Sequence, residues 1–238
     1  MKKMKKSALA AAVLLSLSMM GNVYAEEKLW TEPIVLTGTN QNFDLGTAEG
    51  GPYTGVYIDT EGNAIGVDVT IDGNPTLRMV TEGDIVLKGT GDAGRGISRT
   101  DDNPFGKTAH PSMVFQGRNI EIDGGFAGVY VGFENGTYTF DADNVVIKGG
   151  TRFAVQTQYG TIVKINENSM SGTVKFSSDS TVAGSGAIAA ASGSKEIDIY
   201  GDYVEIVSNG NMGIYGYNGD VNIVQTGAGE KNKVYVKA

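Results

Sequence analysis

The stretch "NIEIDGGFAGVYVG" at residues 119–132 is followed 25 positions later by "NVVIKGGTRFAVQT" at residues 144–157. Both begin with asparagine, place β-branched residues at alternate positions, and continue through a Gly-Gly pair to a small residue and valine. A repeat of roughly 20 to 50 residues indicates a stacked or radial repeat architecture. Because neither histidine nor cysteine occurs in the repeated phrase, the repetition indicates an architecture and not a reaction.

Short runs that alternate apolar and polar residues fill the chain after residue 25. Examples are DIVLKG (84–89), KEIDIYG (195–201) and DVNIVQ (220–225). Such alternation predicts strands with one buried face, and valine and isoleucine suit the inward positions of a pleated surface. The chain has 35 glycines but 5 prolines, and glycine tolerates the positive φ of sharp corners. With no convincing amphipathic helix after residue 25, the sequence predicts an all-β fold.

The 25-residue period, with three strands and three corners in each repeat, predicts a right-handed parallel β-helix over residues 26–238. In that fold Ile122 and Ile147 lie on the same inward face of neighbouring coils. Asn119 and Asn144 form an asparagine ladder, in which each side-chain amide bonds to the next coil. The alternative is an antiparallel β-sandwich, because the Asn-Gly pairs at 135–136 and 218–219 are strong hairpin signals. Asn-Gly also suits the corners of a coil, so the repeat favours the β-helix.

The first 25 residues are organised as a secretory signal peptide. Four lysines within the first six residues precede an apolar run over residues 8–17, and VYA ends the segment at residue 25. This run is shorter than the roughly 20 apolar residues that a membrane span needs. We therefore expect export through the Sec pathway, cleavage after Ala25, and a mature chain of residues 26–238 without a transmembrane segment.

The composition restricts the partners and the chemistry. The whole chain has 19 basic and 27 acidic residues, a net charge of −8. Because residues 1–25 contain four lysines and no acid, the remaining chain has 15 against 27, a net charge of −12. An acidic surface repels phosphate backbones, so no nucleic acid is expected as a partner. The absence of cysteine excludes thiol chemistry, and the single histidine, His110, is expected to be a solvated loop residue.

Three glycine-rich rungs resemble the passenger of a Gram-negative autotransporter: GRNIEIDGG (117–125), ADNVVIKGG (142–150) and GDYVEIVSNG (201–210). The resemblance implies a non-enzymatic β-helical stalk, frequently an adhesin, at the cell surface or outer membrane or outside the cell. It implies a host-surface protein or glycan as the partner. It also implies a C-terminal translocator barrel, whose strand pattern does not follow the rungs in this sequence. Since KVYVK (233–237) is followed by no polar cap, we expect residues 26–238 to be the N-terminal part of a longer passenger.

A secreted polysaccharide-active enzyme, similar to pectin lyases or polygalacturonases, is the alternative function. Such catalysis needs clustered carboxylates with basic residues nearby. The best local candidate is the stretch 91–104, which contains Asp92, Arg95, Arg99, Asp101 and Asp102. Adjacent aspartates before Asn-Pro are also typical of a polar turn, and the Gly-His-Gly of the hydrolases is absent. We therefore predict no enzyme, no catalytic residue and no cofactor-binding residue.

Two further sequence patterns, a pair of aspartates and a group of tyrosines, bear on whether the protein binds a ligand. Asp141 and Asp143 are too few for a specific calcium site without partners from other coils, so we predict no metal site and favour solvated acids. Four tyrosines occur late in the chain, and rings along a solenoid face can bind sugars or proteins. They are equally consistent with ordinary outward strand residues. The tyrosines are Tyr200, Tyr203, Tyr215 and Tyr217.

Overall fold

The computed structural model describes residues 27–36, 42–44, 54–67, 73–99, 110–132, 135–191, 193–210, 212–227 and 233–238. All regular structure in these residues is β-strand. The strands are β1 (Glu27–Trp30), β2 (Ile34–Leu36), β3 (Asn42–Asp44), β4 (Gly55–Val67), β5 (Thr76–Val80), β6 (Asp84–Arg99), β7 (Ser112–Gly124), β8 (Ala127–Gly132), β9 (Thr137–Gly149), β10 (Phe153–Gln158), β11 (Ile162–Ile165), β12 (Thr173–Ser178), β13 (Gly186–Ala190), β14 (Glu196–Gly201), β15 (Tyr203–Ser208), β16 (Met212–Gly216), β17 (Asp220–Gln225) and β18 (Lys233–Lys237). The predicted signal peptide, residues 1–25, lies outside the described residues and stays a prediction.

The strands form three faces, each built from parallel pairings between successive coils. The first face consists of β1, the starts of β4 and β6, the ends of β7 and β9, and β12, β15 and β18. The second face consists of β2, the ends of β4 and β6, and β8, β10, β13 and β16. The third face consists of β3, β5, the starts of β7 and β9, and β11, β14 and β17.

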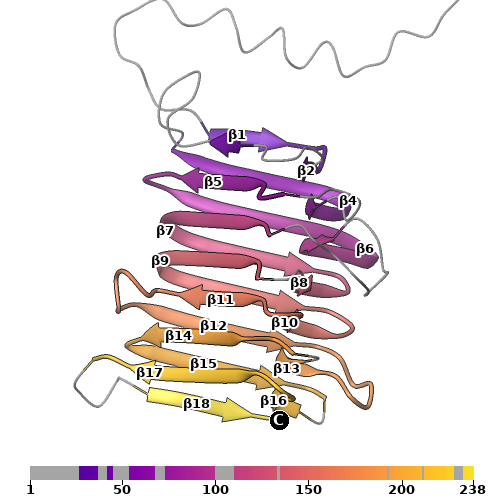
Figure 1. Ribbon diagram of the computed structural model, residues 1–238, viewed down its shortest axis with the longest axis vertical. Helices are drawn as coiled ribbons and strands as arrows, with labels where there is room; N and C mark the ends of the chain where they lie inside the picture. Colours follow the sequence, from indigo (N-terminus) through magenta and orange to yellow (C-terminus); the bar gives the residue numbers. More distant parts are fainter. Residues whose placement is uncertain are drawn as a thin grey trace, which may run out of the picture.

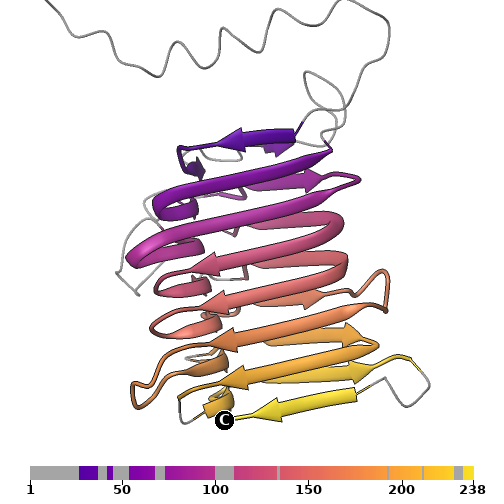
Figure 2. The same ribbon diagram turned by 180° about the vertical axis from the view of Figure 1, so that it is seen from behind.

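The three faces wind into one column, as the repeat predicts. Figure 1 shows the third face in front, with its segments stacked from β5 down to β17, and Figure 2 shows the first face from outside, ending at the yellow β18. The chain runs leftward along the third face and returns rightward along the first face behind it while it descends, which is a right-handed path. The fold is a right-handed parallel β-helix.

The antiparallel alternative is wrong. Asn135 and Asn218 do adopt left-handed backbone angles, with φ of 55° and 58°. The strands beside the first of these turns nevertheless pair in parallel with strands of neighbouring coils. β8 pairs with β6 and β10, and β9 pairs with β7 and β11. Asn-Gly therefore forms a coil corner here and not a hairpin.

Inward valine and isoleucine side chains stack in columns along the helix. Ile120 aligns with Val145, and Ile122 aligns with Ile147, as predicted; each is at most 1% exposed. On the third face the rings of Phe115 and Phe140 stack with centroids 5.0 Å apart. Each coil therefore covers the apolar side chains of the coil before it.

The 25-residue spacing holds for the step from β7 to β9 and, on the third face, also for the step from β9 to β11. Equivalent residues on the other steps of the first face are 28 to 35 positions apart. The difference arises at the corners: residues 125–126 alone separate β7 from β8, whereas residues 179–185 separate β12 from β13. Corners lie outside the core, so their length varies while the inward columns stay in register.

The asparagine and Gly-Gly positions of the repeated phrase have separate roles. Asn144 Nδ2 donates to Asn119 Oδ1 at 2.7 Å, and Asn119 Nδ2 donates to Asp84 Oδ1 at 2.8 Å, so the predicted ladder is confirmed and continues to an aspartate. A Cβ on Gly150 would lie 2.2 Å from the Gly125 carbonyl oxygen. The Gly-Gly pairs do not have positive φ, and the close approach of successive backbones is what requires them. At other corners glycine does supply positive φ as expected, for example at Gly160 and Gly172.

Candidate functional site

The stretch 91–104, the best local candidate in the sequence for a catalytic loop, does not form one surface cluster among its described residues. Asp92 is exposed in the bend of β6, and Arg95 is half-buried. Arg99 is 1% exposed and turned into the interior, so it does not face a polysaccharide outside the coil. Asp101 and Asp102 lie outside the described residues, so their part in a site is untested.

Within the described ranges, no group of three or more histidine, aspartate or glutamate side chains is placed to hold a metal ion. Asp141 is 8% exposed, and its carboxylate accepts a hydrogen bond from Ser169 N at 3.3 Å. Asp141 therefore stabilises the corner between β11 and β12, while Asp143 is exposed.

His110 is half-buried, and its backbone N donates to the Gly73 carbonyl at 2.8 Å.

The four late tyrosines do not share one face. Tyr200 is on β14 of the third face, and Tyr203 is on β15 of the first face. Tyr215 on β16 and the adjacent Tyr217 have parallel rings, with centroids 6.3 Å apart and an interplanar angle of 3°. Of these four tyrosines, Tyr215 lines a concave site on the second face.

That site is a groove of about 310 Å³ over the outside of the second face. Its floor follows one register column, in which Tyr130, Gln156, Ala189 and Tyr215 align on β8, β10, β13 and β16. Adjacent strands lie about 4.8 Å apart, so the two tyrosines are separated by about 14 Å along the column. The residues that line the groove are Phe126, Tyr130, Arg152, Phe153, Gln156, Gly184, Ala189, Ala191 and Tyr215.

Two stacked corners place side chains at the edge of the groove. Phe126 and Arg152 each follow a Gly-Gly corner on successive coils. Arg152 N donates to the Phe126 carbonyl at 2.9 Å, and Ser178 Oγ donates to the Arg152 carbonyl at 2.6 Å. These bonds fix the corner backbone, while the Arg152 side chain is exposed.

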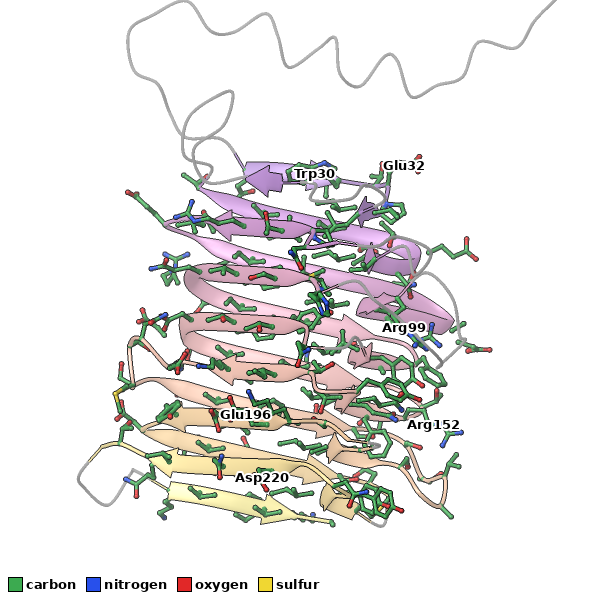
Figure 3. The ribbon with its side chains drawn as sticks, in the orientation of Figure 1. Trp30, Glu32, Arg99, Arg152, Glu196 and Asp220 are labelled. Carbon is green, nitrogen blue, oxygen red and sulfur yellow. The ribbon has the colours of Figure 1, made fainter. Side chains whose placement is uncertain are left out.

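Positive charge and aromatic rings occur together on this side of an acidic chain. The Arg95 guanidinium carbon lies 4.8 Å from the Phe126 ring centroid and 5.0 Å from that of Tyr130. The Arg152 side chain makes no hydrogen bond or ion pair with any other described residue. Figure 3 shows Arg152 on the side formed by β8, β10 and β13, whereas Glu196 and Asp220 lie over the third face. Among the described lining residues, none has a carboxylate.

Two polar side chains, one on β6 and one on β9, are buried in the interior of the coil. Arg99 is 1% exposed and Tyr138 is 0% exposed, and neither the guanidinium nor the phenol has a hydrogen-bond partner among the described residues. Burial raises the pKa of Tyr138 above its ordinary value, and the positive charge of Arg99 lowers that pKa by a smaller amount. Tyr138 therefore stays a neutral phenol in the folded protein.

Sequence reasoning identified Tyr215 but missed Phe126, Tyr130 and Arg152. The steps along the groove floor are 26, 33 and 26 residues, so a single period does not bring its members together. The local signal is present but weak. Phe126 is the first residue after one Gly-Gly pair, and Arg152 is the second residue after the next Gly-Gly pair. Recognising it requires the register of the coils.

These features define a parallel β-solenoid protein with an aromatic and arginine-lined groove on one face. A scan against protein-family models and searches of curated proteins and of solved structures found no match. The described part of the chain has no helix of the length and hydropathy needed to cross a membrane. The groove offers flat rings, an amide and a guanidinium group, which are suited to binding a polar ligand.

Proposed function

We propose that this protein is an exported, surface-associated β-helical stalk with an adhesin-like binding role and no enzymatic activity. The observation that supports a binding role is the groove on the second face, in which Tyr130, Tyr215 and Arg152 line one concave surface. Tyrosine rings provide contact area at a low cost in conformational entropy, and a planar guanidinium binds oxyanions through two parallel hydrogen bonds.

The location follows from other parts of the sequence. The basic start and apolar run of residues 1–25 support export through the Sec pathway. The glycine-rich rungs, which resemble autotransporter passengers, support a place at the cell surface, in association with the outer membrane or outside the cell. On this proposal the partner is a host-surface protein or glycan.

Export is tested by expressing the full 238-residue chain in a Gram-negative host. We expect exported material to begin at Glu26, with Glu-Glu-Lys-Leu-Trp as the first residues read by N-terminal sequencing. Exported protein that retains residues 1–25, or protein confined to the cytoplasm, would overturn the proposed location.

A polysaccharide-active enzyme is the second candidate. Asp92 and Arg95 both lie on β6, and Arg95 is in contact with Phe126 at the groove edge. We expect the purified protein to release neither reducing nor unsaturated ends from pectin and polygalacturonate. Reproducible release, abolished by Asp92→Asn, Asp101→Asn or Asp102→Asn, would establish the enzyme and overturn the proposed stalk.

A further inference from the structure

We infer that the groove on the second face binds an anionic oligosaccharide. Tyr130 and Tyr215 stack against sugar rings, and Arg152 pairs with a carboxylate or sulfate of the sugar. This inference rests on the proposed binding function and specifies the chemical class of its ligand.

The shape of the groove suits a short chain of sugar rings. Tyr130 and Tyr215 mark the two ends of a column that is about 14 Å long. Gln156 and Ala189 lie between them in register. Gln156 is half-buried and Ala189 is 0% exposed, so the amide is the group that the floor offers between the two tyrosines. A pyranose presents a flat C–H face to an aromatic ring and hydroxyl groups at its edge, where the Gln156 amide can both donate and accept hydrogen bonds.

The charge of the groove favours an anion. Of the five arginines in the chain, Arg152 lines the groove and Arg95 lies against its Phe126 and Tyr130 rings, although residues 26–238 have a net charge of −12. Arg152 is exposed at the groove edge, and its guanidinium has no partner among the described residues. A charge-assisted, bidentate bond to a carboxylate or sulfate would satisfy that group, and no carboxylate among the described lining residues competes for it.

A peptide strand is a poorer occupant, because the backbone of this face is already paired. β8 pairs with β6 and β10, β10 pairs with β8 and β13, and β13 pairs with β10 and β16. Peptides that bind by strand addition need a free sheet edge, which the floor of this groove does not offer. Recognition therefore depends on side chains, and these are rings, an amide and a guanidinium.

The test is isothermal titration of the purified, exported protein with three tetrasaccharides. Tetragalacturonate supplies carboxylates, a heparin-derived tetrasaccharide supplies sulfates, and maltotetraose is neutral. We expect at least one anionic probe to bind at least about tenfold more tightly than maltotetraose, as expected for one charge-assisted hydrogen bond. Preference between the two anionic probes identifies the acid group. Equal affinity for maltotetraose, or no binding of either anionic probe, would overturn the inference.

Matched variants locate the binding site. Arg152→Gln and Arg118→Gln each remove one exposed positive charge, but Arg118 lies at the start of the first face beside Asp84, at 3.1 Å. We expect Arg152→Gln to weaken anionic binding about tenfold and Arg118→Gln to leave it unchanged. Equal losses would show an effect of net charge alone and would overturn the groove assignment. Tyr215→Ala, compared with Tyr200→Ala on the third face, tests the stacking in the same way.

Two outcomes separate this inference from the proposed function. Cleavage of tetragalacturonate during the titration would overturn the non-enzymatic stalk while supporting an anion-binding groove. Surface-displayed protein that adheres to host cells but binds neither anionic probe would overturn the inference while leaving the proposed function intact. Binding of tetraglutamate as tight as that of the anionic sugars would contradict the assignment to a carbohydrate.

Discussion

Adjacent residues of β7 have opposite environments because successive side chains of a strand point to opposite faces. Ile122 is 0% exposed and aligns with Ile147. Glu121 faces outward, and its Oε1 lies 2.9 Å from Lys148 Nζ, with both side chains more than a third exposed. The alternation read from the sequence therefore assigned these two residues correctly.

We expect Ile122→Asp to lower the free energy of unfolding by more than about 4 kcal/mol, because it buries an unpaired charge. Glu121→Gln loses only a surface ion pair and should cost about 1 kcal/mol or less. Urea denaturation of the two variants measures the difference. Similar losses would contradict the inward position of Ile122.

For Arg99, in contrast to Ile122, we expect that replacing the buried side chain does not lower the stability of the protein. Its guanidinium is buried without a hydrogen-bond partner among the described residues, and a buried charge without a partner is costly. Arg99→Met keeps a long apolar side chain and removes the charge, so we expect the urea midpoint to stay the same or to rise. A loss of more than about 3 kcal/mol would reveal a charged partner and contradict this account.

Tyr138 predicts how stability depends on alkaline pH. Burial raises its pKa in the folded protein above the ordinary value of 10.0, so above that pH the folded state keeps a proton that the unfolded state loses. The contribution to stability is complete below about pH 10 and decreases as the pH rises further. We expect the urea midpoint of Tyr138→Phe to fall less than that of the unaltered protein between about pH 9 and about pH 11. Equal declines would contradict the burial of the phenol.

At the scale of strands and corners, the alternating runs were predicted well and the corners less well. KEIDIYG, DYVEIVS and DVNIVQ form β14, β15 and β17. β6, β7 and β9, by contrast, extend over 13 to 16 residues and pass through two faces without interruption. A change of face without a break in pairing leaves no mark in a pattern of period two, so the sequence suggested shorter, separate strands.

Corners require glycine for one of two reasons: close approach of another backbone segment, or a positive φ. A Cβ on Gly150 would meet the Gly125 carbonyl at 2.2 Å, whereas Gly184 has a φ of +82° and open space around it. Gly150→Ala must separate two backbones, and we expect a loss of more than about 3 kcal/mol. Gly184→Ala only places an alanine in the left-handed region, so we expect it to lower the free energy of unfolding by about 1–2 kcal/mol. Thermal or urea unfolding compares them, and an equal cost would contradict the role assigned to close backbone approach.

At the scale of the whole molecule, each coil contacts mainly its neighbours, so stability is approximately a sum of coil and interface terms. Ile147 on β9 is 0% exposed, whereas Val234 and Val236 on β18 are 44% and 47% exposed. We expect the amides of β18 to exchange with solvent deuterium much faster than those of β9 in the full chain. Equal protection, measured by mass spectrometry, would show that the column unfolds as one cooperative unit.

The sequence by itself determined the all-β class, the parallel stacking, the inward Ile122 and Ile147, and the asparagine ladder. Each of these depends on alternation along one strand or on the step from β7 to β9. In that step the corners are short, and every pair of aligned residues on the two strands is 25 positions apart. Only the tertiary structure decided the register of the other coils, the interior position of Arg99, and the groove between Tyr130 and Tyr215. The physical reason is that corner residues lie outside the core, so packing does not restrict their number, and outward side chains from different coils meet only after the inward columns have set the register.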